Sequence, residues 1–305
     1  MAKAKPPSAY QTPDLAGKDI IKLLTLNSVY GRRLSDVFDD WIALVEATLM
    51  MEPKHLLWQR KFGIPAPDTS EVQALWTRMR ASYDQHDCVF THFAQALGVL
   101  KNAATHAYED ILGSCSMEIG AANAWKGQFF TPMAVAKMMA MVNNDIPERV
   151  YSRIRAAIIA TPAAQALIDA ADLDATRAGK NEWFWFELIP LIWPQFDPVT
   201  AYDPCVGSGI MLIATGGSLA PWMSRWGFVQ FYGQDVDKTC AQMANINFLL
   251  YGFNGHGLRC DLAAGRDPRP ASAEVDWDAL WPVRERIEIT TATVEAVPAM
   301  ALELA

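Results

Sequence analysis

The sequence predicts an α/β protein in which a helical N-terminal domain precedes a domain built around a parallel sheet. Apolar residues recur at helical spacing through most of residues 18–120. After residue 198, short β-branched and aromatic runs alternate with helical patterns, which is typical of a parallel sheet. A glycine-containing turn follows the first of these runs. We therefore expect a helical domain over residues 1–120 and an α/β domain over residues 121–305.

The N-terminal domain is expected to contain several amphipathic helices. Residues 1–17 are rich in Pro, Lys and Ala and are typical of a flexible start. The pair Ser70-Glu71 predicts a helix that begins near Val72. Two more helices are expected at residues 86–101 and 104–119. Apolar residues at helical spacing predict two earlier helices, through Ile20, Leu23 and Leu24 and through Val37, Trp41, Leu44, Val45 and Leu49.

The middle of the chain is also expected to be helical. Thr131 suits a helix N-cap, and Pro132 suits the first helical position, where its missing N–H costs nothing. Residues 143–180 are alanine-rich and helical in pattern. The tryptophans around residues 183–193 are interpreted as packing residues.

The region after Pro198 supplies the predicted sheet. A strand ending at Asp203 leads through a glycine turn into a helix that begins at Ile210. A second strand ends near Asp235, and a helix follows from Lys238 to Tyr251. A third strand leads to Asp261. The four predicted strands cover residues 199–202, 228–232, 257–260 and 287–294.

The turn Asp203-Pro-Cys-Val-Gly-Ser-Gly209 is the strongest candidate for a ligand site. Gly207 and Gly209 allow a sharp turn and a close approach of the backbone to a ligand. A Gly-x-Gly pair alone is also compatible with an ordinary strand–helix turn. The whole string, including Asp203 and Pro204, is more specific. It is typical of enzymes that bind S-adenosylmethionine, in which the acid receives the amino-acid end of that cofactor.

Two further carboxylates follow predicted strands. Asp235 lies 26 residues after Gly209, near the spacing of a ribose-binding acid, but it is also compatible with a helix N-cap. Asp261 follows the third predicted strand, where it would accept from the adenine amino group of a cofactor. A solvated loop aspartate is the alternative for Asp261.

Several motifs resemble those of the N6-adenine DNA methylase family and follow one another along the chain in the same order. That family includes the modification subunits of type I restriction–modification systems. The segment Gly127-Gln-Phe-Phe-Thr-Pro132 is similar to the family's opening motif, and Tyr108-Glu-Asp-Ile-Leu-Gly113 to the helix before it. The turn at 203–209 resembles its glycine loop, and Tyr232-Gly-Gln-Asp-Val-Asp237 its second-strand motif. The resemblance covers residues 104–263.

The resemblance implies a Rossmann-like class I methyltransferase core and S-adenosylmethionine as the cofactor. It places Phe130, Thr131 and Pro132 at one end of the cofactor site, although Phe130 is equally compatible with a core aromatic. Asp203, Pro204, Gly207 and Gly209 would line the methionine portion, Asp235 the ribose and Asp261 the adenine. The implied activity is adenine-N6 methylation of DNA, in a restriction–modification or mobile-element context.

One family motif is not found in this sequence, namely the catalytic Asn/Asp-Pro-Pro-Tyr/Phe. Asp267-Pro-Arg-Pro270 is the nearest string, and it is better interpreted as a proline-rich turn. Three explanations stay open: a cofactor-binding protein that does not methylate DNA, half of a split enzyme, or an unrecognised substitute residue. We expect later strands and any DNA-recognition region to lie beyond Ala305. The catalytic residues are therefore unknown, and an inactive cofactor-binding module acting through protein partners is the alternative function.

Composition narrows the expected partners and compartment. The net charge of −8 is unlike that of a stand-alone DNA-binding protein, so three alternatives stay open: DNA contact through a local patch, DNA contact through a specificity or partner subunit, or no DNA contact. The five cysteines show no Cys-x-x-Cys spacing, which predicts no structural zinc site and no disulfide framework. A cytoplasmic protein with no membrane segment is expected, because the N-terminus lacks an apolar core and no long apolar run follows.

Overall fold

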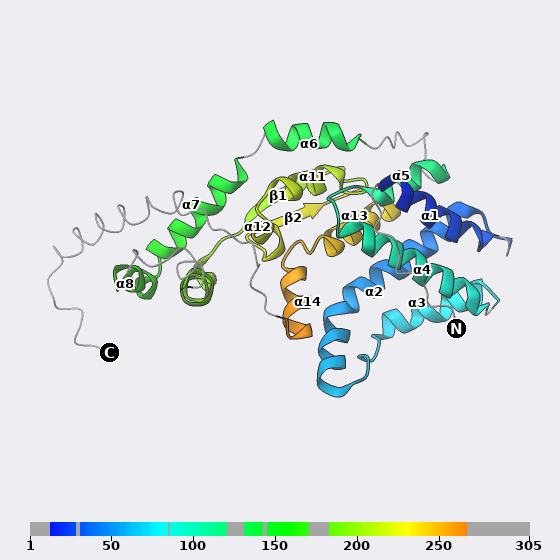
Figure 1. Ribbon diagram of the computed structural model, residues 1–305, viewed down its shortest axis with the longest axis horizontal. Coiled ribbons are helices and arrows are strands. Elements are labelled where there is room, and N and C mark those ends of the chain that lie inside the picture. The colour runs from blue at the N-terminus through cyan, green and yellow to red at the C-terminus, as the bar shows by residue number, and fades with distance from the viewer. Residues whose placement is uncertain are drawn as a thin grey trace, which may run out of the picture. The chain divides into compact units, whose positions relative to one another are not determined.

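The computed structural model describes residues 13–28, 31–84, 86–120, 131–142, 145–170 and 183–266, which are mostly helical (Figure 1). The described residues fold into two compact units, one formed by those within 1–144 and 200–266 and the other by those within 145–199. The first unit thus joins the N-terminal helices to the glycine-turn region. The domain boundary at residue 120 stays a prediction.

The helical N-terminal region is confirmed. Its helices are α1 Pro13–Thr25, α2 Leu34–Phe62, α3 Ser70–Ser82, α4 Asp87–Ala104 and α5 Ile111–Ile119. The helix predicted from residue 104 begins only at Ile111. The reason is a cap: the Asp110 side chain accepts a hydrogen bond from Gly113 N at 2.9 Å, which satisfies a free N–H of the first turn.

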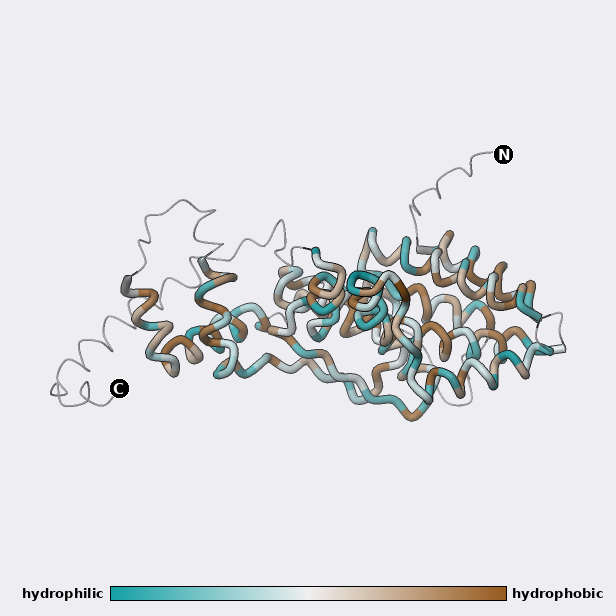
Figure 2. Tube along the Cα trace, turned by 90° about the horizontal axis from the view of Figure 1, so that it is seen from below, coloured by the Kyte–Doolittle hydropathy of each residue, from teal (hydrophilic) through white to brown (hydrophobic). Residues whose placement is uncertain are grey.

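A hydrophobic core unites these helices with α13, Lys238–Leu250. Trp41 is fully buried, and its indole N–H donates to Phe93 O at 3.1 Å. Cys240, Met243 and Ile246 of α13 belong to the same core. Apolar and polar residues alternate along the helices in Figure 2, as expected of amphipathic helices that share one buried side. Burial against α2 therefore fixes α13 in place.

The α/β region contains a two-stranded parallel sheet formed by β1, Val199–Asp203, and β2, Val229–Gly233. Both strands occur where the sequence predicts them. They are followed by helices in the expected positions, namely α11 Ile210–Ser218 after β1, with α12 Pro221–Arg225, and α13 after β2. The described residues form this small sheet and not a complete Rossmann-like core.

The third strand, predicted at residues 257–260, is wrong: these residues lie in helix α14, His256–Ala264. Gly255 and Gly265, with φ of 73° and 71°, bracket this helix. In place of a third strand, the Asn254 side chain bonds to the backbone of β2. Its oxygen accepts from Phe231 N at 2.8 Å, and its nitrogen donates to Phe231 O at 3.0 Å. The fourth predicted strand, 287–294, lies outside the described residues.

The second unit is helical in its described part. Its elements are α7 Ile146–Ile159, α8 Pro162–Ala170, the π-helical turn η3 Phe184–Leu188, α10 Ile189–Ile192 and the 3-10 turn η4 Trp193–Gln195. Trp185 is buried edge-on against Phe184, in keeping with the packing interpretation, whereas Trp193 is 42% exposed. Throughout the described part of the chain, the helices are too short or too polar to cross a membrane.

Candidate functional site

The glycine turn lies at the carboxyl end of β1. Gly207 and Gly209 have φ of 54° and 93°, a left-handed conformation that favours glycine. The Asp203 carboxylate turns back over the loop and accepts a hydrogen bond from Cys205 N at 3.0 Å. Helix α11 begins immediately after Gly209. The turn thus places backbone N–H groups at a helix start beside a half-buried carboxylate.

Asp235 follows the neighbouring strand and is bonded directly to the glycine turn. Its carboxylate accepts from Gly207 N at 2.9 Å and from Asp237 N at 2.8 Å. The N-cap of α13 is Asp237, whose side chain accepts from Thr239 N at 2.9 Å. The N-cap interpretation of Asp235 is therefore wrong. A carboxylate offers about four acceptor positions, so Asp235 retains two for a ligand.

Helix α6, Met133–Val142, brings the Thr131-Pro132 pair to the same end of the unit. Ala136 and Ala140 of α6 pack against Ile210 and Ala214 of α11. Met141, near the end of α6, shares a cavity with Gly217 and Ser218 at the end of α11. The two helices therefore run parallel, so Thr131 and Pro132, which precede α6, lie toward the start of α11, where the glycine turn ends. Phe130 lies outside the described residues.

A buried polar cluster holds the turn from below, and sequence reasoning did not predict it. Ser208 Oγ donates to the Asp110 carboxylate, and Asn247 Nδ2 donates to Ser208 O at 2.8 Å and to Asp110 Oδ1 at 3.4 Å. Asp110 is 6% exposed, and burial raises the pKa of its carboxyl although the hydrogen bonds oppose this. The cluster fixes the turn to α5 and α13.

Gly209 has a packing role in addition to its turn conformation. A Cβ at this position would lie 3.3 Å from Ala244 Cα and from Phe248 Cε1 of α13. The turn therefore needs glycine here to let α13 approach. Glycines at ligand turns serve both purposes, a sharp turn and close packing of the following helix.

The open side of the turn carries exposed apolar groups. Val236, between the two aspartates at the end of β2, is fully exposed, and the rings of Tyr202 and Tyr232 are about half exposed. Sequence reasoning missed Val236, although an apolar residue directly after a strand-end acid is a visible signal. This side of the turn thus presents both apolar groups and carboxylate oxygens to solvent.

Residues 184–267 match the family model described as N-6 DNA Methylase. Over this segment, the chain is similar to the N6-adenine DNA methylase family. The segment includes β1, the glycine turn, β2, α13 and α14. The chain matches no curated protein and no solved structure.

Within the methylase segment, Asp261 does not join the other candidate residues. It lies on α14 and pairs with Arg266 at 2.9 Å and with Arg225 at 3.9 Å. It lines a cavity of about 450 Å³ beside Leu250 and Tyr251, at the end of α13. Asp235 lies before the start of α13, and this helix is about 20 Å long at 1.5 Å per residue. Asp235 and Asp261 therefore lie at opposite ends of α13. The placement of Asp261 follows from the helix that replaces the predicted strand.

Proposed function

We propose that the carboxyl ends of β1 and β2 bind S-adenosylmethionine and that the chain acts in adenine-N6 methylation of DNA. One observation carries the proposal: two half-buried carboxylates, Asp203 and Asp235, flank a glycine turn that a buried cluster holds rigid. Ligands of open parallel sheets bind at this edge. The match of residues 184–267 to the methylase family supports the same assignment.

The residues present fit the cofactor. Asp203 and the turn at Gly207 suit its charged amino-acid portion, and the remaining acceptor positions of Asp235 suit a ribose hydroxyl pair. Val236 offers an exposed apolar surface for the adenine ring. Thr131 and Pro132 would border the site from α6. The bound cofactor supplies the methyl group, and the chain's own residues bind and orient it.

The missing Asn/Asp-Pro-Pro-Tyr/Phe motif supports a second candidate function. In the family, this motif orients the amino group of a flipped adenine. A chain without it would act with a partner subunit that supplies the motif, with a substitute residue of its own, or as a cofactor-binding module that works through protein contacts. The net charge of −8 also favours DNA contact through a partner subunit, as in a restriction–modification complex.

Calorimetry with S-adenosylmethionine tests the binding step. We expect Asp235→Ala to weaken binding by roughly 1.5–3 kcal/mol, because a buried hydroxyl pair loses a charged acceptor. Asp261→Ala is the matched control, and its affinity should equal that of the unaltered chain. Equal affinity of Asp235→Ala and the unaltered chain would remove Asp235 from the site.

Transfer of a labelled methyl group to DNA tests the catalytic step. We expect transfer only when the chain is combined with its partner subunits. Cofactor binding without transfer under any combination would favour the binding module.

A further inference from the structure

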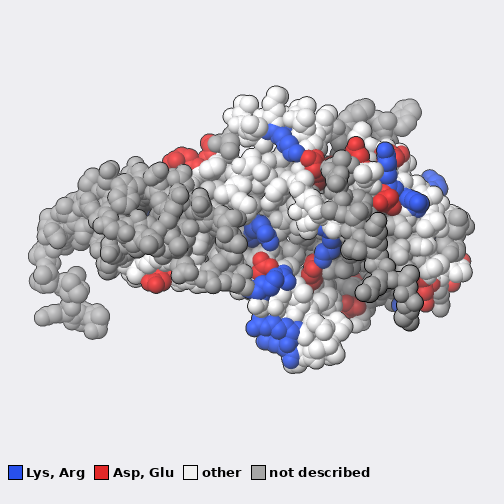
Figure 3. All heavy atoms as spheres, in the orientation of Figure 1, with Lys and Arg blue, Asp and Glu red and all other residues white. Residues whose placement is uncertain are grey.

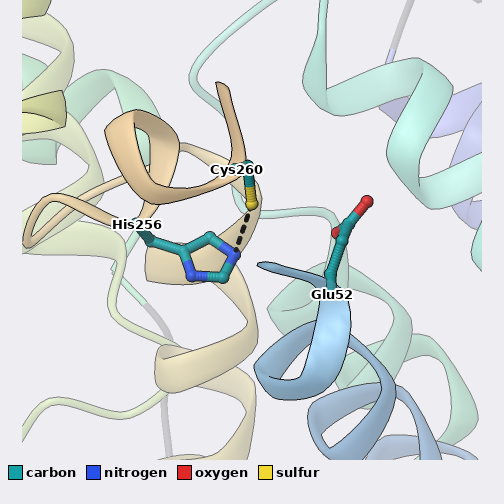
Figure 4. Close-up of side chains that lie close together, drawn as sticks. All are labelled: Glu52, His256 and Cys260. Carbon is teal, nitrogen blue, oxygen red and sulfur yellow. Dashed lines mark hydrogen bonds between the residues drawn. The ribbon is translucent and has the colours of Figure 1, made fainter. Parts of the chain in front are cut away.

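Three side chains with metal-binding atoms converge on one side of the first unit, away from the glycine turn. They are Glu52 of α2 and His256 and Cys260 of α14. One ligand atom from each residue lies within 4.8 Å of the other two. Figure 4 shows His256 and Cys260 on one helix and Glu52 on the facing helix. Helices α2 and α14 pack directly against each other, which fixes this arrangement.

The spacing of the two α14 residues suits chelation. Residues i and i+4 lie on the same face of a helix, one turn apart. Cys260 Sγ lies 3.5 Å from His256 Nε2. Two ligands of a tetrahedral zinc ion, with bonds of about 2.3 Å to sulfur and about 2.05 Å to nitrogen, are separated by about 3.6 Å. The pair therefore already has the separation that a shared zinc ion requires.

Glu52 is held in position by a neighbouring lysine. Lys101 Nζ lies 2.6 Å from Glu52 Oε1, and the carboxylate has a second oxygen for a metal. Hydrogen-bonded partners behind the ligands commonly orient carboxylates at metal sites. The Glu52 ligand oxygen lies within 4.8 Å of the His256 and Cys260 ligand atoms, so coordination of a shared ion would require the Glu52 side chain to move inward.

The surroundings suit a partly enclosed site with one open position. His256 is 4% exposed, and its ring is held between α14 and the facing helix α2. All three residues line the cavity of about 450 Å³, which has room for water as a fourth ligand. Basic and acidic side chains are interspersed on the face shown in Figure 3, and Asp261 pairs with both Arg225 and Arg266 in this cavity.

We propose that Glu52, His256 and Cys260 bind one zinc ion, with the fourth position open to the cavity. The nitrogen, sulfur and oxygen donor set suits this borderline-soft ion. On binding, the Cys260 thiol forms a bond to zinc and releases its proton to solvent. The ion would link α2 to α14 of the methylase segment. This site is separate from the proposed cofactor site and does not depend on it. The alternative is a metal-free thiol–imidazole hydrogen bond.

Zinc binding by the full chain tests the proposal. The purified chain is stripped with a chelator, dialysed against zinc alone and analysed for bound metal. We expect one zinc ion per chain, and a loss of affinity of at least about tenfold in Cys260→Ser and Glu52→Gln. Cys88→Ser and His106→Gln are the controls: the first removes an exposed thiol, and the second removes an imidazole from the same cavity. Both should bind zinc as the unaltered chain does.

Cobalt provides a readout that depends on the thiolate itself. The cobalt-loaded chain should show a thiolate-to-metal charge-transfer band, which Cys88→Ser retains and Cys260→Ser loses. Circular dichroism of the metal-free variants establishes that they are folded. If Cys260→Ser does not fold, the band in the unaltered chain and in Cys88→Ser decides the question. Absence of that band, or zinc binding equal in folded Cys260→Ser and the unaltered chain, overturns the proposal.

Discussion

The buried side of the glycine turn is held by Asp110, Ser208 and Asn247, whereas its open side presents Tyr202 and Val236 to solvent. On the buried side, every residue takes part in a shared hydrogen-bond network. On the open side, the apolar groups are exposed next to carboxylates that keep acceptor positions. The same short segment thus has one side fixed by the fold and another available to a ligand.

Residues on the buried side should therefore contribute to the stability of the fold, and residues on the open side to ligand binding. A buried polar network is costly to break, because each lost partner leaves a desolvated group unpaired. An exposed side chain contributes little to folding and contributes to binding only when a ligand covers it. Substitutions on the two sides should therefore affect different measurements.

Asp110→Ala should have the largest effect on stability. It removes the acceptor of Ser208 Oγ, Gly113 N and Asn247 Nδ2 in a fully buried position, and it also removes the cap of α5. We expect the free energy of unfolding to fall by about 3 kcal/mol in urea denaturation.

The control for this change is Asp145→Ala, whose carboxylate is 71% exposed and lies 4.0 Å from the Arg149 guanidinium. The free energy of unfolding of Asp145→Ala should stay within about 0.5 kcal/mol of the unaltered value. Equal losses in Asp110→Ala and Asp145→Ala would contradict the stabilising role assigned to the buried Asp110 cluster.

The Asp110 cluster also shows what sequence reasoning misses. Local patterns predict the strand before Asp203 and the helix from Lys238, because β-branched runs and helical periodicity are local signals. Asp110 and Ser208 are 98 residues apart, and no local pattern reports a contact over that distance.

The wrong strand at residues 257–260 has a different origin. A segment as short as Gly257-Leu-Arg-Cys260 fits either a strand or one helical turn, and only its flanks decide between them. Gly255 and Gly265 are at those flanks and act as helix caps. The same helix moves Asp261 away from the glycine turn and brings His256 and Cys260 onto one face. Glu52 of α2 meets His256 and Cys260 of α14 only because the two helices pack together in the fold. The spacing of cysteines along the sequence therefore cannot predict this candidate metal site.

Gly209→Ala should have the next largest effect, since Gly209 belongs to both sides of the turn. The alanine would take φ of 93° and place its Cβ 3.3 Å from the α13 backbone at Ala244. We expect a loss of about 2 kcal/mol in the free energy of unfolding.

Gly98→Ala is the matched control, because Gly98 lies within α4 with open space around its Cβ position. That change should stabilise the chain by about 0.5–1 kcal/mol. A loss of stability at Gly98 equal to that at Gly209 would show that the left-handed turn and the α13 contact are unimportant.

Val236→Ser should have the smallest effect and should appear only in binding. Val236 is fully exposed, so its replacement should leave the free energy of unfolding within about 0.5 kcal/mol of the unaltered value. If an adenine ring covers it in the complex, losing its apolar surface should weaken S-adenosylmethionine binding by about 1 kcal/mol, or roughly fivefold in calorimetry. Val142→Ser, at an exposed apolar position on α6, should leave the affinity unchanged. A change in stability without a change in affinity at Val236 would reverse the roles assigned to the two sides, because it would mean that the open side supports the fold and does not contact the ligand.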